Sequence, residues 1–234
     1  MLQDPLHPTL KTKLKHPSTK NTNLVKKKSN EGHDMKKNLL SLIVLILTCW
    51  SAPTFAKDEK CVALAKLAST VYRNKASANE FQMLQTWEAT SNPIDFAFIR
   101  LFTGLAFNVN KLPSNDFEGA TNDFCQRIVT AAITPESRFE NAMPSSCESI
   151  VAHSQIINTF KQSGDTPTTL RKQFLKTYSQ NNSVHRGIVD YLSLMSEMRF
   201  SNLLSNRSDE DFMKFSKKSC TAFASYTARI DNHR

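Results

Sequence analysis

Apolar residues recur at helical spacing through most of the chain. In the segment that begins at Cys61 they fall at Cys61, Leu64, Ala68 and Val71, and positions three or four residues apart share one face of a helix. The segment that begins at Cys147 has similar spacing. Alternating runs of β-branched residues are too short to indicate strands. The pattern therefore predicts an all-α fold.

Helix start signals divide residues 57–132 into four predicted helices. The third, IDFAFIRLFTGLAFNV, is apolar on nearly all sides and is therefore the expected central helix. The signals are the stripe from Cys61, a capping box at Ser77–Glu80 for a helix to about Ala89, Asn92–Pro93 as N-cap and first helical residue, and Ser114 as the cap of the last helix.

Residues 145–234 repeat this plan, after a predicted linker at 133–144 that contains two prolines. The signals are a capping box at Ser145–Glu148, Thr166–Pro167 for the second helix, an apolar third helix from Ile188 to Leu204, and Ser208–Asp211 as the cap of the last helix. The sequence thus predicts two tandem four-helix units.

The two predicted units also match at fixed offsets. A shift of 95 residues superposes Asp95 on Asp190 and Cys125 on Cys220, whereas the opening helices need a shift of 86. The second unit therefore holds about nine extra residues, which we place around Gln162–Pro167. We interpret the two units as a degenerate tandem duplication.

Four of the five cysteines are predicted to form disulfides. Cys49 lies in the leader described below, and an even count in an exported protein indicates disulfides, with three possible pairings. The duplication favours one bridge in each unit, Cys61–Cys125 and Cys147–Cys220, joining the first helix to the last. Closing loops of this length stabilises a fold by roughly 4 kcal/mol per bridge in the chain-entropy model.

The segment from Met35 to Ala56 has the layout of a secretory signal peptide. Two lysines precede a 12-residue apolar run, Leu39–Trp50, which is short for a membrane-spanning helix of about 20 residues. Thr-Phe-Ala then places the cleavage between Ala56 and Lys57. The alternatives are an uncleaved anchor and a lipoprotein cut before Cys49. We expect a periplasmic or secreted protein without stable membrane insertion after cleavage.

Residues 1–34 are rich in Lys, Thr, Asn and Pro and lack apolar periodicity. The three consecutive lysines at 26–28 are typical of a nucleic-acid patch or a localisation tag. However, they stand just before a methionine that opens a complete signal peptide. We therefore interpret residues 1–34 as a non-native or disordered extension, with Met35 as the start.

Most of the net charge of +9 belongs to the leader. Residues 1–56 hold nine Lys or Arg and three Asp or Glu, whereas the remaining 178 residues hold 21 basic and 18 acidic ones. This nearly balanced part gives no support for nucleic-acid binding. It also holds 14 of the 15 phenylalanines, which indicates a globular core rather than disorder.

The sequence contains no motif for catalysis, a metal or a cofactor. His153, His185 and His233 are far apart, and zinc spacings, nucleophile elbows and phosphate-binding loops are absent. The predicted bridges leave no free thiol after residue 56. We interpret His153 as a surface or boundary histidine, and a catalytic histidine is the alternative.

Carboxylates recur at equivalent positions of the two units, as Asp95 with Asp190 and Asp116 with Asp211. In the first turn of a helix, a carboxylate can accept hydrogen bonds from unpaired amides and interacts favourably with the helix dipole. We therefore interpret these residues as helix-start carboxylates rather than as an acid–base pair.

Two further groups of residues could contact a ligand. The phenylalanines of the third helix indicate core, or the face where the two units meet, and a pocket for a hydrophobic molecule is the alternative: Phe96, Phe98, Phe102 and Phe107. The basic residues of the second unit indicate a solvated face, with contact to an anion as the alternative: Lys161, Arg171, Lys172, Lys176, Lys214, Lys217 and Lys218.

The first unit resembles small exported helical proteins of Gram-negative bacteria, which are mostly uncharacterised. The resemblance lies in C-x-x-L-A-x-x-A-x-x-V-Y-R-N from Cys61 to Asn74, followed by an apolar helix and a closing cysteine. It implies a disulfide-clamped periplasmic helical unit, here in two copies, and carries no functional residues. Export, helices and bridges are more distantly similar to periplasmic immunity proteins of type VI secretion systems and to small acid-stress chaperones, whose motifs are absent here.

These observations favour a non-enzymatic protein that acts through protein–protein contact, such as an inhibitor, an immunity protein or a chaperone-like binder. No cofactor is expected. The alternatives are a carrier or sensor of a hydrophobic small molecule and an unrecognised hydrolase. A structure in which His153 or His185 is exposed and isolated would argue against the hydrolase.

The mass of the exported protein tests the leader and the cysteine predictions together. We expect an intact mass equal to residues 57–234 minus four hydrogens, because two bridges form and the leader is removed. Mass spectrometry of the non-reduced protein measures it. A mass that includes residues before Lys57 would contradict the predicted cleavage.

Overall fold

The computed structural model describes residues 56–109, 111–134, 143–178 and 182–231. Over these ranges the protein forms eight α-helices and one 3₁₀ turn and contains no strand, so the predicted all-α class is confirmed. The helices are α2 (Ala56–Asn74), α3 (Glu80–Glu88), α4 (Pro93–Asn108), α5 (Ser114–Ile133), α6 (Cys147–Gln162), α7 (Pro167–Thr177), α8 (Ser183–Phe200) and α9 (Asp209–Asp231). Residues 1–34, and the predicted leader before Ala56, lie outside the described residues.

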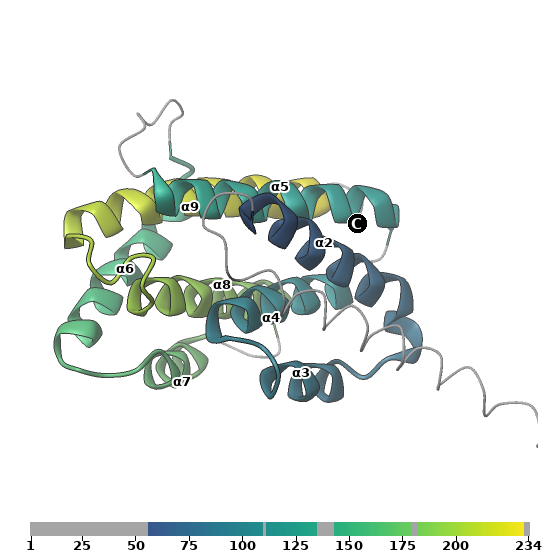
Figure 1. Cartoon of the computed structure of the whole chain (residues 1–234), viewed down its shortest axis with the longest axis horizontal. Coiled ribbons are helices and arrows are strands. Elements are labelled where there is room, and N and C mark those ends of the chain that lie inside the picture. Colours follow the sequence, from purple (N-terminus) through teal and green to yellow (C-terminus); the bar gives the residue numbers. More distant parts are fainter. Residues whose placement is uncertain (1–55, 110, 135–142, 179–181, 232–234) are drawn as a thin grey trace, which may run out of the picture. The chain divides into compact units, whose positions relative to one another are not determined.

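The eight helices pack in two layers (Figure 1). One layer has the order α2, α5, α9, α6, and the other has the order α3, α4, α8, α7. Contacts of α2 with α4 and of α6 with α8 join the layers. Each layer therefore places helices of residues 145–234 beside their counterparts from residues 57–132.

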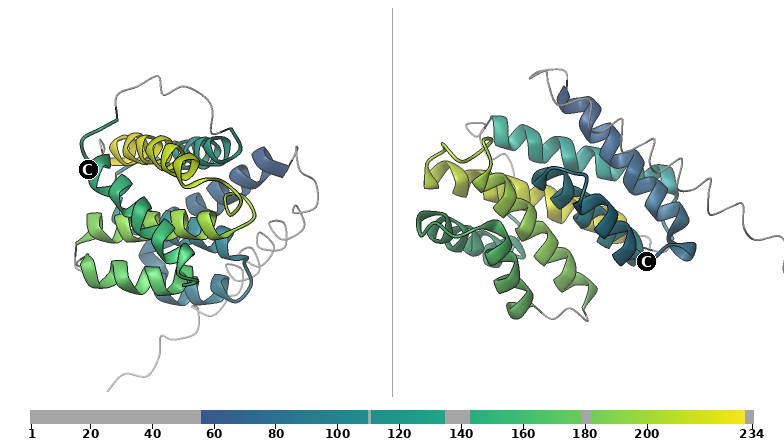
Figure 2. Two further views of the ribbon diagram at one scale, coloured as in Figure 1. Left: turned by 90° about the vertical axis from the view of Figure 1, so that its left-hand side faces the viewer. Right: turned by 60° about the horizontal axis from the view of Figure 1, so that its bottom comes forward.

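The two predicted four-helix units share one compact body rather than forming separate domains. Within each half the same helices meet: the first packs on the third and the fourth, and the second packs on the third. Between the halves, the third helices pack together and so do the fourth helices, as the turned views of Figure 2 also show for α5 and α9. The repeated arrangement agrees with a duplication, which stays a prediction.

Two lysines at equivalent positions of the halves make similar contacts, which also agrees with a duplication. Lys75, which follows α2, donates to the carbonyl oxygens of Ala106 and Val109 at the end of α4. Lys161, its counterpart at an offset of 86, donates to the carbonyl oxygen of Ser205 after α8. Each half thus fixes the end of its third helix with a lysine from the end of its first.

The extra residues of the second half are spread along it, contrary to the prediction of an insertion near Gln162–Pro167. The bridging cysteines of the first helices, Cys61 and Cys147, are 86 residues apart, and the helix starts differ by 87 residues for the second helices, 90 for the third and 95 for the fourth. The connection from α6 to α7 is short, and Gly164 supports its turn with a φ of 80°. Most of the extra residues of the second half therefore lie after the start of α7.

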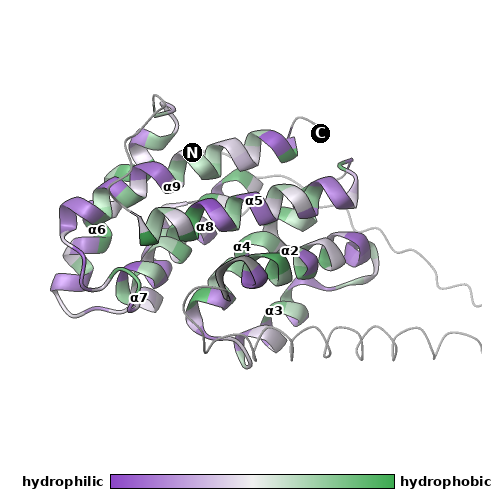
Figure 3. Cartoon of the chain, turned by 45° about the horizontal axis from the view of Figure 1, so that its top comes forward, coloured by the Kyte–Doolittle hydropathy of each residue, from purple (hydrophilic) through white to green (hydrophobic). Residues whose placement is uncertain are grey.

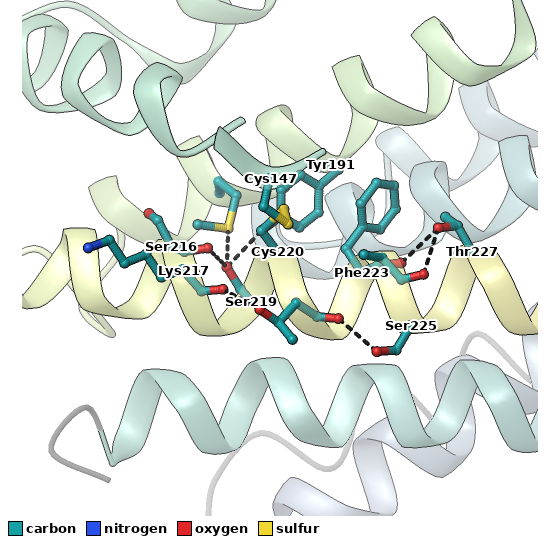
Figure 4. The surroundings of a disulfide bond; sticks show 12 residues. Cys147, Tyr191, Ser216, Lys217, Ser219, Cys220, Phe223, Ser225 and Thr227 are labelled. Carbon is teal, nitrogen blue, oxygen red and sulfur yellow. Dashed lines mark hydrogen bonds between the residues drawn. A yellow bond between two sulfur atoms is a disulfide. The ribbon is translucent and has the colours of Figure 1, made fainter. Parts of the chain in front are cut away.

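Both predicted disulfides are present. Cys61 on α2 bonds Cys125 on α5, and Cys147 on α6 bonds Cys220 on α9. Each bridge joins the first helix of its half to the last, and all four cysteines are buried. Figure 4 shows the second bridge beside Tyr191, whose hydroxyl lies 2.7 Å from the Ser219 hydroxyl.

The bridges are typical of an oxidising, extracellular-type environment. Over the residues that the structure describes, every helix is too short or too polar to span a bilayer.

Aromatic side chains from four helices form the core between the halves. Phe102 of α4 lies edge-on to Phe124 of α5, and Phe124 stacks on Tyr226 of α9 with ring centroids 4.9 Å apart. Phe223 of α9 stacks on Tyr191 of α8 at 4.4 Å. Each such pair contributes about 0.5–1.5 kcal/mol beyond its burial. The prediction that the phenylalanines of α4 form core at the meeting face is confirmed for Phe102.

Hydropathy along the ribbon follows this arrangement. The helix α4, which packs against α2, α3 and α8, is largely hydrophobic, whereas α9 alternates hydrophobic and hydrophilic residues along its length (Figure 3). A helix that is covered on several sides needs apolar residues on each of them, whereas a helix with one solvated face does not.

Three of the predicted helix caps are confirmed. Asn92 accepts from the backbone N–H of Asp95, and Thr166 accepts from that of Thr169. At the start of α9, Ser208 accepts from the backbone N–H of Asp211. Side chains that can cap a helix locally therefore fixed these boundaries.

Three other predicted caps are wrong. Asn79 caps α3 in place of Ser77, because residues 75–77 form a 3₁₀ turn. Ser145 does not cap α6, since it belongs to a backbone turn before the helix, and Ser146, which stands at the cap position, makes no side-chain cap. Ser114 is the first residue of α5 rather than its cap.

The third helix of the second half also differs from its prediction. It begins at Ser183 instead of Ile188, because the Asn182 side chain accepts from two amides of its first turn, and it ends at Phe200 instead of Leu204.

Arg199 connects the end of α8 to three other segments. Its side chain is 3% exposed and donates to Asn158 of α6, to the carbonyl oxygen of Leu204 and to the carboxylate of Asp209. Because the acceptors come from separate segments, one guanidinium group fixes the connection between α8 and α9 against α6.

Replacing Arg199 should therefore destabilise the fold strongly. In an Arg199→Met variant, Asn158 and Leu204 lose a buried donor, and we expect the free energy of unfolding to fall by about 3 kcal/mol. Urea denaturation with intact disulfides measures it. The control is Arg207→Met, at an exposed side chain of the same connection, where we expect a change within about 0.5 kcal/mol. Equal losses in both variants would contradict the role of Arg199.

Candidate functional site

A cleft of about 450 Å³ lies between the pair α3–α4 and the pair α7–α8. In Figure 1 the helices α3 and α7 lie on the same side of α4 and α8, one at each half. The cleft therefore has walls from both halves of the protein. Its charged and aromatic lining residues are Glu88, Phe96, Arg100, Arg171, Lys172 and Glu197.

Two helices begin at this cleft. Pro93 and Pro167, the first residues of α4 and α7, both line it. Proline suits a first helical position, because its missing N–H would have no helical partner there. The positive ends of two helix dipoles therefore lie at the cleft and favour an anionic group.

Two of the lining arginines share the carboxylate of Asp190. Arg171 of α7 donates from Nη2 to Oδ1 of Asp190 at 3.3 Å, and Nε of Arg100 on α4 lies 3.9 Å from the same oxygen. Asp190 reaches α4 because Gly104 stands opposite, where an added Cβ would lie 3.3 Å from Oδ2. One carboxylate thus ties the two walls of the cleft together.

The same arginines keep unused hydrogen-bond donors. The Nε–H groups of Arg100 and Arg171 are buried, and none of the described residues accepts from either. A buried donor without an acceptor costs about 1–3 kcal/mol. Because both arginines also line the cleft, their guanidinium groups are the strongest candidates for contact with a bound acceptor.

Burial dominates the electrostatics around Asp190. It raises the pKa of Asp190, although Arg171 and Arg100 act in the opposite direction. Burial also raises the pKa of Glu197, again against the effect of Arg100. Burial and the neighbouring Arg171 lower the pKa of Arg100. The charges are thus held close together where desolvation is only partly offset.

The two outer helices give the cleft opposite walls. The helix α7 contributes Arg171 and Lys172 and carries no acidic residue, whereas α3 contributes Glu88 and carries no basic residue. Glu80 of α3 forms an ion pair with Arg186 of α8 at 3.8 Å. The outer helices thus bring opposite charges to the cleft, whereas α4 adds Arg100 and α8 adds Glu197.

The position of Asp190 corrects the prediction that it starts a helix. It lies in the third turn of α8, and its contacts are the arginines described above. The start of α8 is offset by 90 residues from that of α4, so the counterpart of Asp95 is His185 and not Asp190. The offset of 95, which holds for the last helices, does not hold for the third.

The other three carboxylates lie in first helical turns as predicted. Asp95 forms an ion pair with Lys60 at 2.6 Å, and its backbone N–H donates to the cap Asn92. Asp116 lies in the first turn of α5, and Asp211 in that of α9.

Of the three histidines that follow residue 56, two contact the same tyrosine. His153 of α6 and His185 of α8 flank Tyr178, with ring centroids 5.7 and 5.6 Å from the tyrosine ring. The Tyr178 hydroxyl lies 3.3 Å from Nε2 of His153, and the Ser149 carbonyl oxygen lies 2.6 Å from Nδ1. Neither histidine is isolated, so the condition that would argue against a hydrolase is not met. His233 lies outside the described residues.

A second, more apolar groove of about 300 Å³ lies beside the Cys147–Cys220 bridge. Its lining includes Leu105 of α4, Ile188 of α8 and Phe223 of α9. The phenylalanines of α4 named as a possible hydrophobic pocket do not line it. Across the described ranges, no cluster of three or more histidine, cysteine, aspartate or glutamate side chains is arranged to hold a metal ion.

No family model, curated protein or solved structure matches this protein. The resemblance to small exported helical proteins therefore stays a prediction, and the cleft must be interpreted from its own residues.

The sequence indicated part of this site, because Phe96 was among the residues considered for a hydrophobic pocket. Arg171 and Lys172 were among the basic residues of the second half, but Arg100 and Asp190 were missed as a pair. A signal was available in Arg100, because it is a basic residue within the otherwise apolar helix IDFAFIRLFTGLAFNV. A charge in such a helix needs a partner when it is buried.

The pH dependence of stability tests the burial of Asp190. Its pKa is raised in the folded state, so Asp190 adds stability that is fully present below its unfolded pKa of about 4 and is lost as the pH rises through the folded pKa. Relative to an Asp190→Asn variant, the native protein should therefore gain free energy of unfolding as the pH falls from about 7 to about 4.5. Urea denaturation at each pH measures the difference.

The control for this experiment is Asp116→Asn, at an exposed first-turn residue of α5. It shares the carboxylate-to-amide change but has no buried arginine beside it. If the native protein instead loses stability relative to Asp190→Asn as the pH falls, the arginines rather than burial control this carboxylate.

Proposed function

We propose that this protein is an exported, non-enzymatic binding module of the periplasm or the extracellular space. It engages another protein through the cleft between α3–α4 and α7–α8, as an inhibitor, an immunity protein or a chaperone-like binder would. The observation that carries the proposal is the pair of arginines, Arg100 and Arg171, that are held on one carboxylate and line the cleft from opposite walls.

The cleft has the composition of a recognition site. Arginine and aromatic residues in partly desolvated pockets dominate the binding energy of protein interfaces. Here the guanidinium carbon of Arg100 lies 4.7 Å from the centroid of the Phe96 ring, and Arg171 stands on the opposite wall. Because the walls come from both halves, each half alone would present only part of the site.

The scaffold supports binding rather than rearrangement. Buried disulfides tie α2 to α5 and α6 to α9, all in the layer that does not contain the cleft. The cleft layer then rests on a fixed support, and a pre-organised site loses less entropy on binding. Both bridges also suit an exported protein.

The groove beside the Cys147–Cys220 bridge favours a second candidate function, the transport or sensing of a small hydrophobic molecule. Its volume of about 300 Å³ is roughly twice that of an engineered apolar cavity that binds benzene. Its lining is more apolar than that of the cleft, with Leu105, Ile150 and Phe223 among its residues.

Cross-linking from within the cell tests the leading function. A photoreactive p-benzoylphenylalanine at Lys172, an exposed residue that lines the cleft, should attach to one reproducible protein that mass spectrometry identifies. Adding Arg171→Gln should remove this adduct, because the partner loses a charge-assisted contact of about 1.5–3 kcal/mol, or roughly tenfold or more in affinity.

The matched control places the same photoreactive group at Arg127, which is exposed on α5 in the other layer. The same adducts from both positions, or none from Lys172, would count against a partner at the cleft. A lipid-sized adduct on the exported protein in native mass spectrometry would instead support the carrier function.

A further inference from the structure

The donors of the cleft are directional rather than merely positive. Arg100 and Arg171 both line the cleft and both contact the carboxylate of Asp190, while the buried Nε–H of each donates to none of the described residues. A guanidinium group binds a planar carboxylate through parallel N–H donors, which gives geometry as well as energy. The arrangement therefore selects for the shape of the acceptor.

The charge balance of the cleft argues against a strongly charged ligand. Its three basic lining residues are matched by two lining glutamates and by Asp190. A phosphate carries about −1.5 to −2 charges at neutral pH, and the glutamates would repel it. A single carboxylate brings one charge and accepts hydrogen bonds through two oxygens.

The cleft also has apolar lining residues. Phe96 and Leu175 stand on opposite walls, with Pro93 and Pro167 at the edges. The volume of about 450 Å³ is roughly three times that of a cavity that holds benzene. The cleft thus has room for a carboxylate together with a neighbouring apolar side chain.

We infer that the cleft recognises a carboxylate in a short peptide segment, with Arg171 and Arg100 on the carboxylate and Phe96 and Leu175 on the adjacent apolar side chain. The inference rests on the proposed function and names the chemistry of its partner. The carboxylate comes from an acidic side chain or from the carboxyl terminus of the peptide, because both present the same group.

Four probes test this chemistry on the mature protein by isothermal titration calorimetry. They are acetyl-Leu-Glu-Leu-amide, the neutral acetyl-Leu-Gln-Leu-amide, acetyl-Leu-Leu-Leu with a free carboxyl terminus, and inorganic phosphate. We expect the glutamate peptide or the free carboxyl terminus to bind about tenfold or more tightly than the glutamine peptide, since each adds a charge-assisted contact. Which of the two binds identifies the source of the carboxylate.

Variants show whether the guanidinium group is responsible. Arg171→Gln should abolish the preference for the carboxylate peptides, and Arg171→Lys should do so too, because lysine keeps the charge but lacks the paired N–H donors. Arg127→Gln, on α5, should leave binding unchanged. Each variant is first checked for both disulfides and for cooperative unfolding. Full binding by Arg171→Lys would overturn the role of the donors.

Other results of these experiments would contradict the inference or the proposed function. Equal binding of the glutamate and glutamine peptides, or tighter binding of phosphate than of any peptide, overturns the inference. If the peptides fail but the cross-link from Lys172 persists and depends on Arg171, the cleft binds a partner through other chemistry. If both fail, the proposed function itself fails.

Discussion

The packing of α4 on α8 and of α5 on α9 is the interaction on which the rest of the structure depends. It buries the aromatic rings of Phe102, Phe124 and Tyr226 between the two halves. It also decides which surfaces are left for function, because the outer helices α3 and α7 pack mainly on α4 and α8, on the side away from α5 and α9. The cleft is the space that this arrangement leaves between them.

The same packing brings together the charged side chains of Arg100, Arg171 and Asp190. Arg100 belongs to an apolar helix and finds its carboxylate, Asp190, in the other half, where Arg171 contacts the same group. A buried ion pair adds little stability over apolar packing, but removing one partner leaves an uncompensated charge. The cluster therefore specifies how the halves meet, and it places both arginines at the cleft.

Helix caps, disulfides and the role of Asp190 differed in how well the sequence predicted them. Asn92, Thr166 and Ser208 cap helices as expected, because a cap depends on residues three positions away. Ser77 and Ser145 do not cap helices as predicted, because each belongs to a turn before the helix begins. The bridges Cys61–Cys125 and Cys147–Cys220 followed from the internal repeat, which brings distant residues into one pattern. The prediction that Asp190 lies at a helix start was wrong, because the offset between the halves differs from helix to helix.

The sequence by itself determined the helical class, the central position of the helix at 93–108 and the pairing of the cysteines. Periodicity, apolar content and the repeat can all be read along the sequence without knowing the fold. Only the tertiary structure decided that the halves share one body, that Arg100 meets Arg171 at Asp190, and that His153 and His185 both contact Tyr178. These contacts join residues whose partners lie on other helices, at distances along the sequence that no local pattern encodes. A charge in an apolar helix shows that a partner must exist, and only packing shows which partner it is.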